Sequence, residues 1–204
     1  MYFSVGTGTQ YPRRLLRTGM DAEDIRATFP EVDAIEDDDL RAGVADAWAT
    51  AAAENGVEDL TDVPWLPPTQ RELGLDDERL VDHVRDVTAC ALALTEALHE
   101  RRSDALSLDL DTVVAGALVH DVSKLAEFAG MTETSVYDLL GHPYYGVHVV
   151  ARVGLPIELA HVVLSHTDRT AVEPATIEAE VIRRADEVAS SAIRWRATDD
   201  LRTV

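Results

Sequence analysis

An adjacent histidine and aspartate, His120 and Asp121, are the residues of this sequence best suited to chemistry. They follow the stretch TVVAGALV, which is nearly uniformly apolar and therefore typical of a buried helix. Burying an imidazole beside a carboxylate is costly unless something neutralises them, and a divalent metal ion does this well. We therefore expect a metal at this pair. The structural alternative is that Asp121 caps the following turn and accepts a hydrogen bond from His120.

Six further histidines are spread along the chain: His83, His99, His142, His148, His161 and His166. A lone histidine on a helix is more often a surface or hydrogen-bonded core residue than a ligand. His99 falls in the charged run LHERR, and His161 precedes His166 by five residues, so neither is expected to face a metal. His148 lies about 240° around a helix from His142, so the two cannot share a face. We expect His148 to support the site from behind or to face a substrate.

The elements that must position these residues are predicted to be helices, which makes the fold class all-α. Asp, Ser or Thr precede most of the apolar-periodic segments and Gly or Pro follow them. The predicted helices span about residues 21–29, 38–54, 77–101, 110–120, 134–140, 143–153, 156–165 and 176–196. Strand signals are weak, because no alternating run is bounded by hairpin turns.

Three details of these elements can be tested against a structure. The buried stripe of the helix over 77–101 is predicted to contain Leu80, Val84, Val87, Ala91, Leu94 and Leu98. Gly116 would let a neighbouring helix approach the central helix closely. The connection that holds Pro64, Pro67 and Pro68 is expected to be a surface strap or a lid around Trp65, because three prolines in five residues cannot continue a helix.

The chain resembles the HD-domain superfamily of metal-dependent phosphohydrolases. That signature is a histidine on one helix, an adjacent His-Asp pair on another, and an aspartate on a late helix. The matching segments are LVDHVRDV with His83, GALVHDVSK with His120 and Asp121, and RRADEVAS with Asp186. The resemblance covers about residues 80–190 and implies that these four side chains bind a shared metal ion. It also implies a compact multi-helix HD-domain bundle over residues 76–204, with the helices and proline-rich connection of residues 20–75 packed on it.

Relatives with a second metal add two histidines between the His-Asp pair and the late aspartate. Here HPYYG supplies His142, resembling the HP-x-x-G element of HD-GYP phosphodiesterases, and AHVVLSHT supplies His166. One or two divalent ions are therefore implied. A set of four histidines and two aspartates favours Fe or Mn, with Asp121 bridging, while Mg, Co, Ni or Zn are also compatible. The sequence departs from the HD-GYP pattern at Thr167 and Asp168, which argues against cyclic dinucleotides as substrates.

Lys124 is the only lysine of the chain, and HD-GYP-type relatives carry a lysine at the same place, three residues after the aspartate. Its ammonium could hold a phosphoryl oxygen, or it could be a surface lysine without a role. We assign catalytic roles to Asp121 and Lys124. The expected reaction is hydrolysis of a phosphomonoester or phosphodiester, of a nucleotide or related small molecule, by a metal-activated hydroxide. The alternatives are a di-iron oxygenase with the same ligands and a non-catalytic nucleotide-binding HD module.

The composition is strongly acidic, with 38 acidic against 18 basic residues and a net charge of −20. Such a surface repels nucleic-acid backbones and anionic membranes, so no general grip on nucleic acid and no membrane association are expected. The spread of acids with almost no lysine indicates a halophilic protein, and the lack of a signal or membrane segment indicates a cytoplasmic one. An oligomer is compatible with the sequence. Residues 1–19 carry arginines and no acid, which suggests a disordered tail or a start assigned too early, with Met20 as the initiator.

Overall fold

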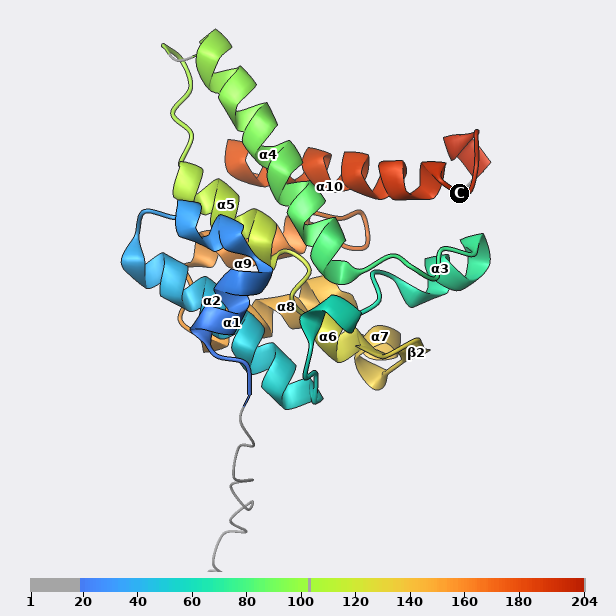
Figure 1. The fold of residues 1–204 in the computed structure, drawn as a ribbon. Coiled ribbons are helices and arrows are strands. Elements are labelled where there is room, and N and C mark those ends of the chain that lie inside the picture. The colour runs from blue at the N-terminus through green and yellow to red at the C-terminus, as the bar shows by residue number, and fades with distance from the viewer. Residues whose placement is uncertain (1–18, 103, 204) are drawn as a thin grey trace, which may run out of the picture.

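The computed structural model describes residues 19–102 and 104–203, and this part of the chain is predominantly helical (Figure 1). The predicted tail falls almost entirely outside the described residues. The α-helices are α1 (Ala22–Thr28), α2 (Asp38–Asn55), α3 (Pro67–Leu73), α4 (Leu80–Arg102), α5 (Leu110–Val119), α6 (Lys124–Glu127), α7 (Ser135–Leu139), α8 (Gly141–Arg152), α9 (Ile157–Ser165) and α10 (Ile177–Trp195). Short 3₁₀ helices span η1 (Pro30–Ala34), η2 (Leu60–Asp62) and η3 (Leu201–Thr203). The predicted all-α class is confirmed.

Local sequence signals account for most helix ends. Asp21 accepts hydrogen bonds from the backbone N–H groups of Glu23 and Asp24, which closes a capping box at the start of α1. Gly56 ends α2 in the left-handed conformation with φ 68°, which glycine adopts without strain.

Besides α6 and the 3₁₀ helices, two small elements were not predicted. The proline-rich connection contains α3, which contradicts the expectation of a strap without a helix. Pro67 and Pro68 occupy the first helical positions, where the missing N–H groups would have no partner within the helix anyway. The second element is a two-stranded antiparallel hairpin, β1 (Phe128–Ala129) with β2 (Thr132–Glu133), which pairs Phe128 with Glu133.

Helix α5 lies at the centre of the helices and contacts α2, α4, α9 and α10. Every residue from Val113 to Val119 is buried. A Cβ at Gly116 would lie 2.6 Å from Ile182 Cδ1, so the predicted close approach of a neighbouring helix is confirmed, and that neighbour is α10. This packing places the end of α5 against α10. His120 directly follows α5, and Asp186 lies on α10.

The predicted buried stripe of α4 is confirmed except at Leu94. Leu80, Val84, Val87 and Ala91 are fully buried, whereas Leu94 is 39% exposed. Thr95 is only 6% exposed and Leu98 is half-buried against the core, so the buried face of α4 passes through Thr95 in place of Leu94. Helix α10 crosses α4 (Figure 1).

The N-terminal helices share the main hydrophobic core rather than forming a separate one. Trp48 of α2 is fully buried, packs on Phe29 with ring centroids 4.8 Å apart, and donates its indole N–H to the Leu118 carbonyl at 3.0 Å. That carbonyl lies in the last turn of α5, where backbone acceptors lack partners within the helix. Residues 20–62 therefore brace the helix end that presents His120. Among the described residues, no helix is both long and apolar enough to cross a bilayer.

Candidate metal centre

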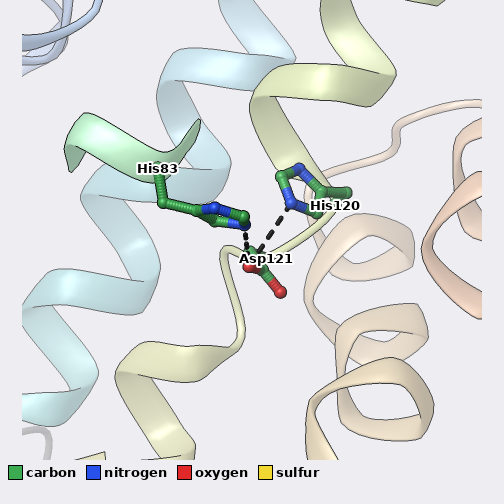
Figure 2. Close-up of side chains that lie close together, drawn as sticks. All are labelled: His83, His120 and Asp121. Carbon is green, nitrogen blue, oxygen red and sulfur yellow. Dashed lines mark ion pairs between the residues drawn. The ribbon is translucent and has the colours of Figure 1, made fainter. Parts of the chain in front are cut away.

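The four side chains of the expected first site converge from three remote helices. His83 lies on α4, His120 and Asp121 lie on the turn after α5, and Asp186 lies on α10. Figure 2 shows His83 and His120 pointing at Asp121. The Nε2 atoms of His83 and His120 lie 3.2 and 3.3 Å from Asp121 Oδ2. Asp186 Oδ1 lies 3.1 Å from His83 Nε2 and 4.0 Å from His120 Nε2.

The two further predicted histidines face the other oxygen of the same aspartate. His142 Nε2 lies 3.5 Å and His166 Nε2 lies 3.7 Å from Asp121 Oδ1. Two groups of three side chains therefore have donor atoms close enough to hold an ion, and Asp121 belongs to both. All six predicted residues are brought together, in the arrangement that a carboxylate bridging two cations would require.

Helix ends determine how His120 and His166 are oriented. Each residue follows the last turn of a helix, and its Nδ1 contacts the carbonyl three residues earlier: Ala117 O at 2.7 Å and Val163 O at 2.8 Å. A carbonyl only accepts hydrogen bonds, so Nδ1 must carry the proton in both rings. The Nε2 lone pairs therefore face the centre, which is the form a metal needs.

Buried atoms without partners show that the residues fit a cation. In the described part of the chain, His83 Nε2, His120 Nε2 and Asp121 Oδ1 are buried without a hydrogen bond of acceptable geometry. Leaving such groups unsatisfied is costly; one cation beside the two imidazole nitrogens and a second beside Oδ1 would satisfy them. The capping alternative is not observed, because the N-cap of α6 is Ser123 and no side chain caps this helix.

The protonation states also favour metal binding. Burial would raise the pKa of the Asp121 carboxyl, but Lys124, His120 and His83 together hold it well below its usual value. Burial acts in the same way on Asp186, and the neighbouring His83 imidazole, 3.1 Å away, outweighs it, so this pKa is lowered too. Burial, reinforced by the positive charge of His120, lowers the pKa of His166 to about 3. At neutral pH the carboxylates are ionised and His166 is neutral, as ligands must be.

His120 is the one ligand whose pKa shift does not favour metal binding. Burial would lower the pKa of its imidazole, but the Asp121 and Asp186 charges outweigh burial and raise it. A cation entering the site must therefore compete with protonation of this ring.

Lys124 is buried at the site and is not a surface residue. Its side chain is 6% exposed, and Nζ lies 2.6 Å from Asp121 Oδ2. The ammonium also lies 5.7 Å from the ring centroid of Trp65, which in turn packs on His83 with centroids 5.4 Å apart. Trp65 is 1% exposed, so the proline-rich connection covers this side of the site instead of merely lying on the surface.

The remaining histidines lie away from the centre. His148 is exposed and packs on Tyr145, with ring centroids 5.7 Å apart. It contacts none of the six converging residues, so the expected support from behind is not observed; a role facing a substrate stays a prediction. His161 Nε2 accepts a hydrogen bond from the Ala175 N–H at 2.9 Å, and His99 is exposed.

Two residues near the site were not anticipated from the sequence. Glu127 is fully buried and contacts His142, and Arg169 contacts both of them. The signal for Glu127 was a single acid within the apolar run LAEFA. Arg169 lies in a polar loop and gave no comparable signal.

Comparison with known proteins agrees with this geometry. No match was found among curated proteins or among solved structures. The family model of the HD domain matches residues 80–191, more than half of the chain and the part that carries all six converging side chains. The chain therefore belongs to the HD domain family.

Proposed function

We propose that this protein is a metal-dependent phosphohydrolase that acts on a small phosphate ester of nucleotide-like type. The observation that carries the proposal is the position of Asp121. Each of its carboxylate oxygens lies within 4 Å of the Nε2 atoms of a different pair of buried histidines. Family membership supports the hydrolytic reaction class.

In this proposal, His83, His120 and Asp186 hold one divalent ion, His142 and His166 hold a second, and Asp121 bridges the two. Imidazole and carboxylate donors in this number favour Fe or Mn. Ions bound in this way lower the pKa of a coordinated water to about 7 and withdraw charge from phosphoryl oxygens.

The surrounding residues bind and orient the ester. The Lys124 ammonium forms an ion pair with Asp121 Oδ2, and its N–H groups can donate to a phosphoryl oxygen. The lowered pKa values of Asp121 and Asp186 make them weak bases, so they serve as anionic ligands rather than as proton acceptors. Asp186 keeps 16% of its side chain exposed while His83 and His120 have none, so substrate is expected to enter beside Asp186.

The test is metal analysis followed by phosphate release. The full chain, purified in molar salt because of its acidic composition, is analysed for metal content. It is then assayed against nucleotide and phosphoester panels under argon. We expect bound metal and turnover in the parent protein, and loss of both in His120→Ala and Asp121→Ala. His148→Ala is the matched control, because this exposed histidine contacts none of the six residues.

Three outcomes would overturn the proposal. Turnover that survives in both site variants would refute the metal assignment. Oxygen consumption by the iron-loaded protein, without phosphate release under argon, would instead support the oxygenase alternative. A tightly bound nucleotide without turnover under any metal would support a binding module.

A further inference from the structure

Glu127 is a fully buried acid that lies outside the six converging residues. It ends α6 and directs both carboxylate oxygens at His142. Oε1 accepts the His142 backbone N–H at 2.7 Å, and Oε2 lies 3.0 Å from His142 Nδ1. We infer that Glu127 is a positioning residue that holds His142 in the tautomer able to bind the second ion. This inference rests on the proposed function.

The position of His142 in the fold explains why it needs a carboxylate. His120 and His166 follow helices, so a free carbonyl from the preceding turn accepts their Nδ1 protons. His142 is the second residue of α8, and the start of a helix offers N–H groups instead of carbonyls. An acceptor from another element must therefore orient this ring. Glu127 provides it and also pairs one of the free backbone donors of α8.

The glycine that begins α8 is favoured by its backbone conformation and not by lack of space beside Glu127. Gly141 has φ 75°, a left-handed conformation that other residues rarely adopt. A Cβ at this position would lie 3.6 Å from Glu127 Oε1 and 3.5 Å from Arg169 Nη2. The backbone turn therefore leads His142 directly onto the carboxylate.

Arg169 favours the opposite tautomer of the same ring. Its Nη1 lies 3.3 Å from Glu127 Oε1 and 3.2 Å from His142 Nδ1. Guanidinium nitrogens only donate hydrogen bonds, so Nδ1 can accept from Arg169 only when it carries no proton. Nε2 then carries the proton and points it at Asp121 Oδ1, where the second ion would lie. Glu127 favours a proton on Nδ1 and leaves the Nε2 lone pair free.

Burial decides between the two partners. Glu127 is fully buried and lies closer to Nδ1, while the Arg169 side chain is 37% exposed and partly held over the Tyr137 ring at 5.3 Å. The buried Glu127 carboxylate therefore interacts more strongly with His142 Nδ1 than the partly solvated Arg169 guanidinium does, because electrostatic interactions are stronger in the low-dielectric interior. The Glu127 form therefore predominates.

Glu127→Gln tests this directly, because glutamine has one acceptor oxygen where the site needs two. If its oxygen binds the His142 backbone N–H, its amide N–H₂ faces Nδ1 and imposes the tautomer that cannot bind metal. If the oxygen faces Nδ1, two donors meet at the start of α8. Losing a carboxylate that orients a metal-binding histidine typically costs about 10- to 100-fold in metal affinity.

The experiment titrates the full, metal-free chain with Mn²⁺ and measures the affinity of each site. Parallel samples labelled with ¹⁵N-histidine are studied by long-range ¹H–¹⁵N NMR, without metal and with Zn²⁺. We expect two ions in the parent protein. In Glu127→Gln, the second ion should bind about 10- to 100-fold more weakly, while the first site is unchanged and reports that the fold is intact. The His142 proton should move from Nδ1 to Nε2 in the metal-free variant.

Two further variants separate tautomer control from general destabilisation. Glu127→Asp retains two carboxylate oxygens and should recover part of the affinity. Arg169→Gln should leave the second affinity unchanged or increase it, because it removes the competing donor. Equal losses in Glu127→Gln and Arg169→Gln, or an unmoved His142 proton, would overturn the inference.

The titration of the parent protein separates failure of this inference from failure of the proposed function. No bound ion in the parent would refute the proposed function. Two ions that Glu127→Gln binds equally tightly would overturn only the role of Glu127. One ion in the parent would overturn that role and the second metal site, and would leave the hydrolytic activity to be judged from phosphate release.

Discussion

Replacing Asp121 with asparagine should remove the stabilisation that metal gives to the folded protein. The two carboxylate oxygens face different histidine pairs, whereas asparagine has one oxygen and presents its N–H₂ group to one of those pairs. Neither site keeps its anionic donor. The metal-dependent increase in melting temperature should therefore vanish, although both forms still fold.

The expected size of this effect follows from binding linkage. A ligand at 100 times its dissociation constant stabilises the folded state by about 2.7 kcal/mol. For a chain of this length, each kcal/mol raises the melting temperature by about 2–4 °C, so the parent should gain roughly 5–11 °C. The variant also leaves Lys124 buried without its partner at 2.6 Å, which costs about 3–5 kcal/mol regardless of metal. The quantity to compare is thus, for each protein, the melting temperature with metal minus the melting temperature without metal.

The assay is thermal unfolding of chelator-treated protein in constant molar salt, with and without Mn²⁺. His148→Asn is the control, because it removes an exposed histidine on the helix that also carries His142. We expect the control to keep the full metal-dependent increase. An Asp121→Asn protein that gains as many degrees as the parent would refute the reasoning that this carboxylate joins two metal sites.

Three other predictions concern stability. Gly146→Ala should destabilise the fold by about 1–3 kcal/mol in urea unfolding, because the new Cβ would lie 2.4 Å from Val163 Cγ1 and 3.0 Å from Ser123 Oγ; an unchanged midpoint would contradict the α8–α9 packing. The metal-free protein should lose stability as pH falls from about 6.5 towards 3, because the unfolded His166 binds a proton over this range that the folded one does not, and its pKa in the fold is about 3. His166→Gln should make this slope shallower by up to about 1.4 kcal/mol per pH unit, and parallel slopes would contradict the burial argument. Dialysis into low salt should lower the melting temperature, because the net charge of −20 is then unscreened; a constant melting temperature would count against salt adaptation.

Most of the fold and the six converging residues could be predicted because they depend on local signals. The apolar run of α5 and the adjacent His-Asp pair identified one element of the site, and the spacing of the family signature indicated the others. Capping residues such as Asp21 and Gly56 mark helix ends within one or two positions of those observed.

What could not be predicted depends on contacts between remote elements. Thr95 takes the buried position on α4 in place of Leu94, whereas apolar periodicity alone favours the leucine. Helix α3 begins with two prolines, and in a sequence two prolines are compatible both with the end of a helix and with the first turn of one. The pairing of Glu127 with His142 arises only when α6 packs on α8, and Arg169 reaches both residues from the loop after α9.

The origin of the converging residues on five separate helices or their ends has a consequence for how the protein folds and lasts. The centre is complete only after a loop of roughly a hundred residues between His83 and Asp186 has closed, so unfolded chains present no preformed chelate to an ion. An ion bound there would bind late in folding, and it would link segments that must separate when the protein unfolds. Metal supply would then lengthen the lifetime of the native chain far more than it would hasten folding.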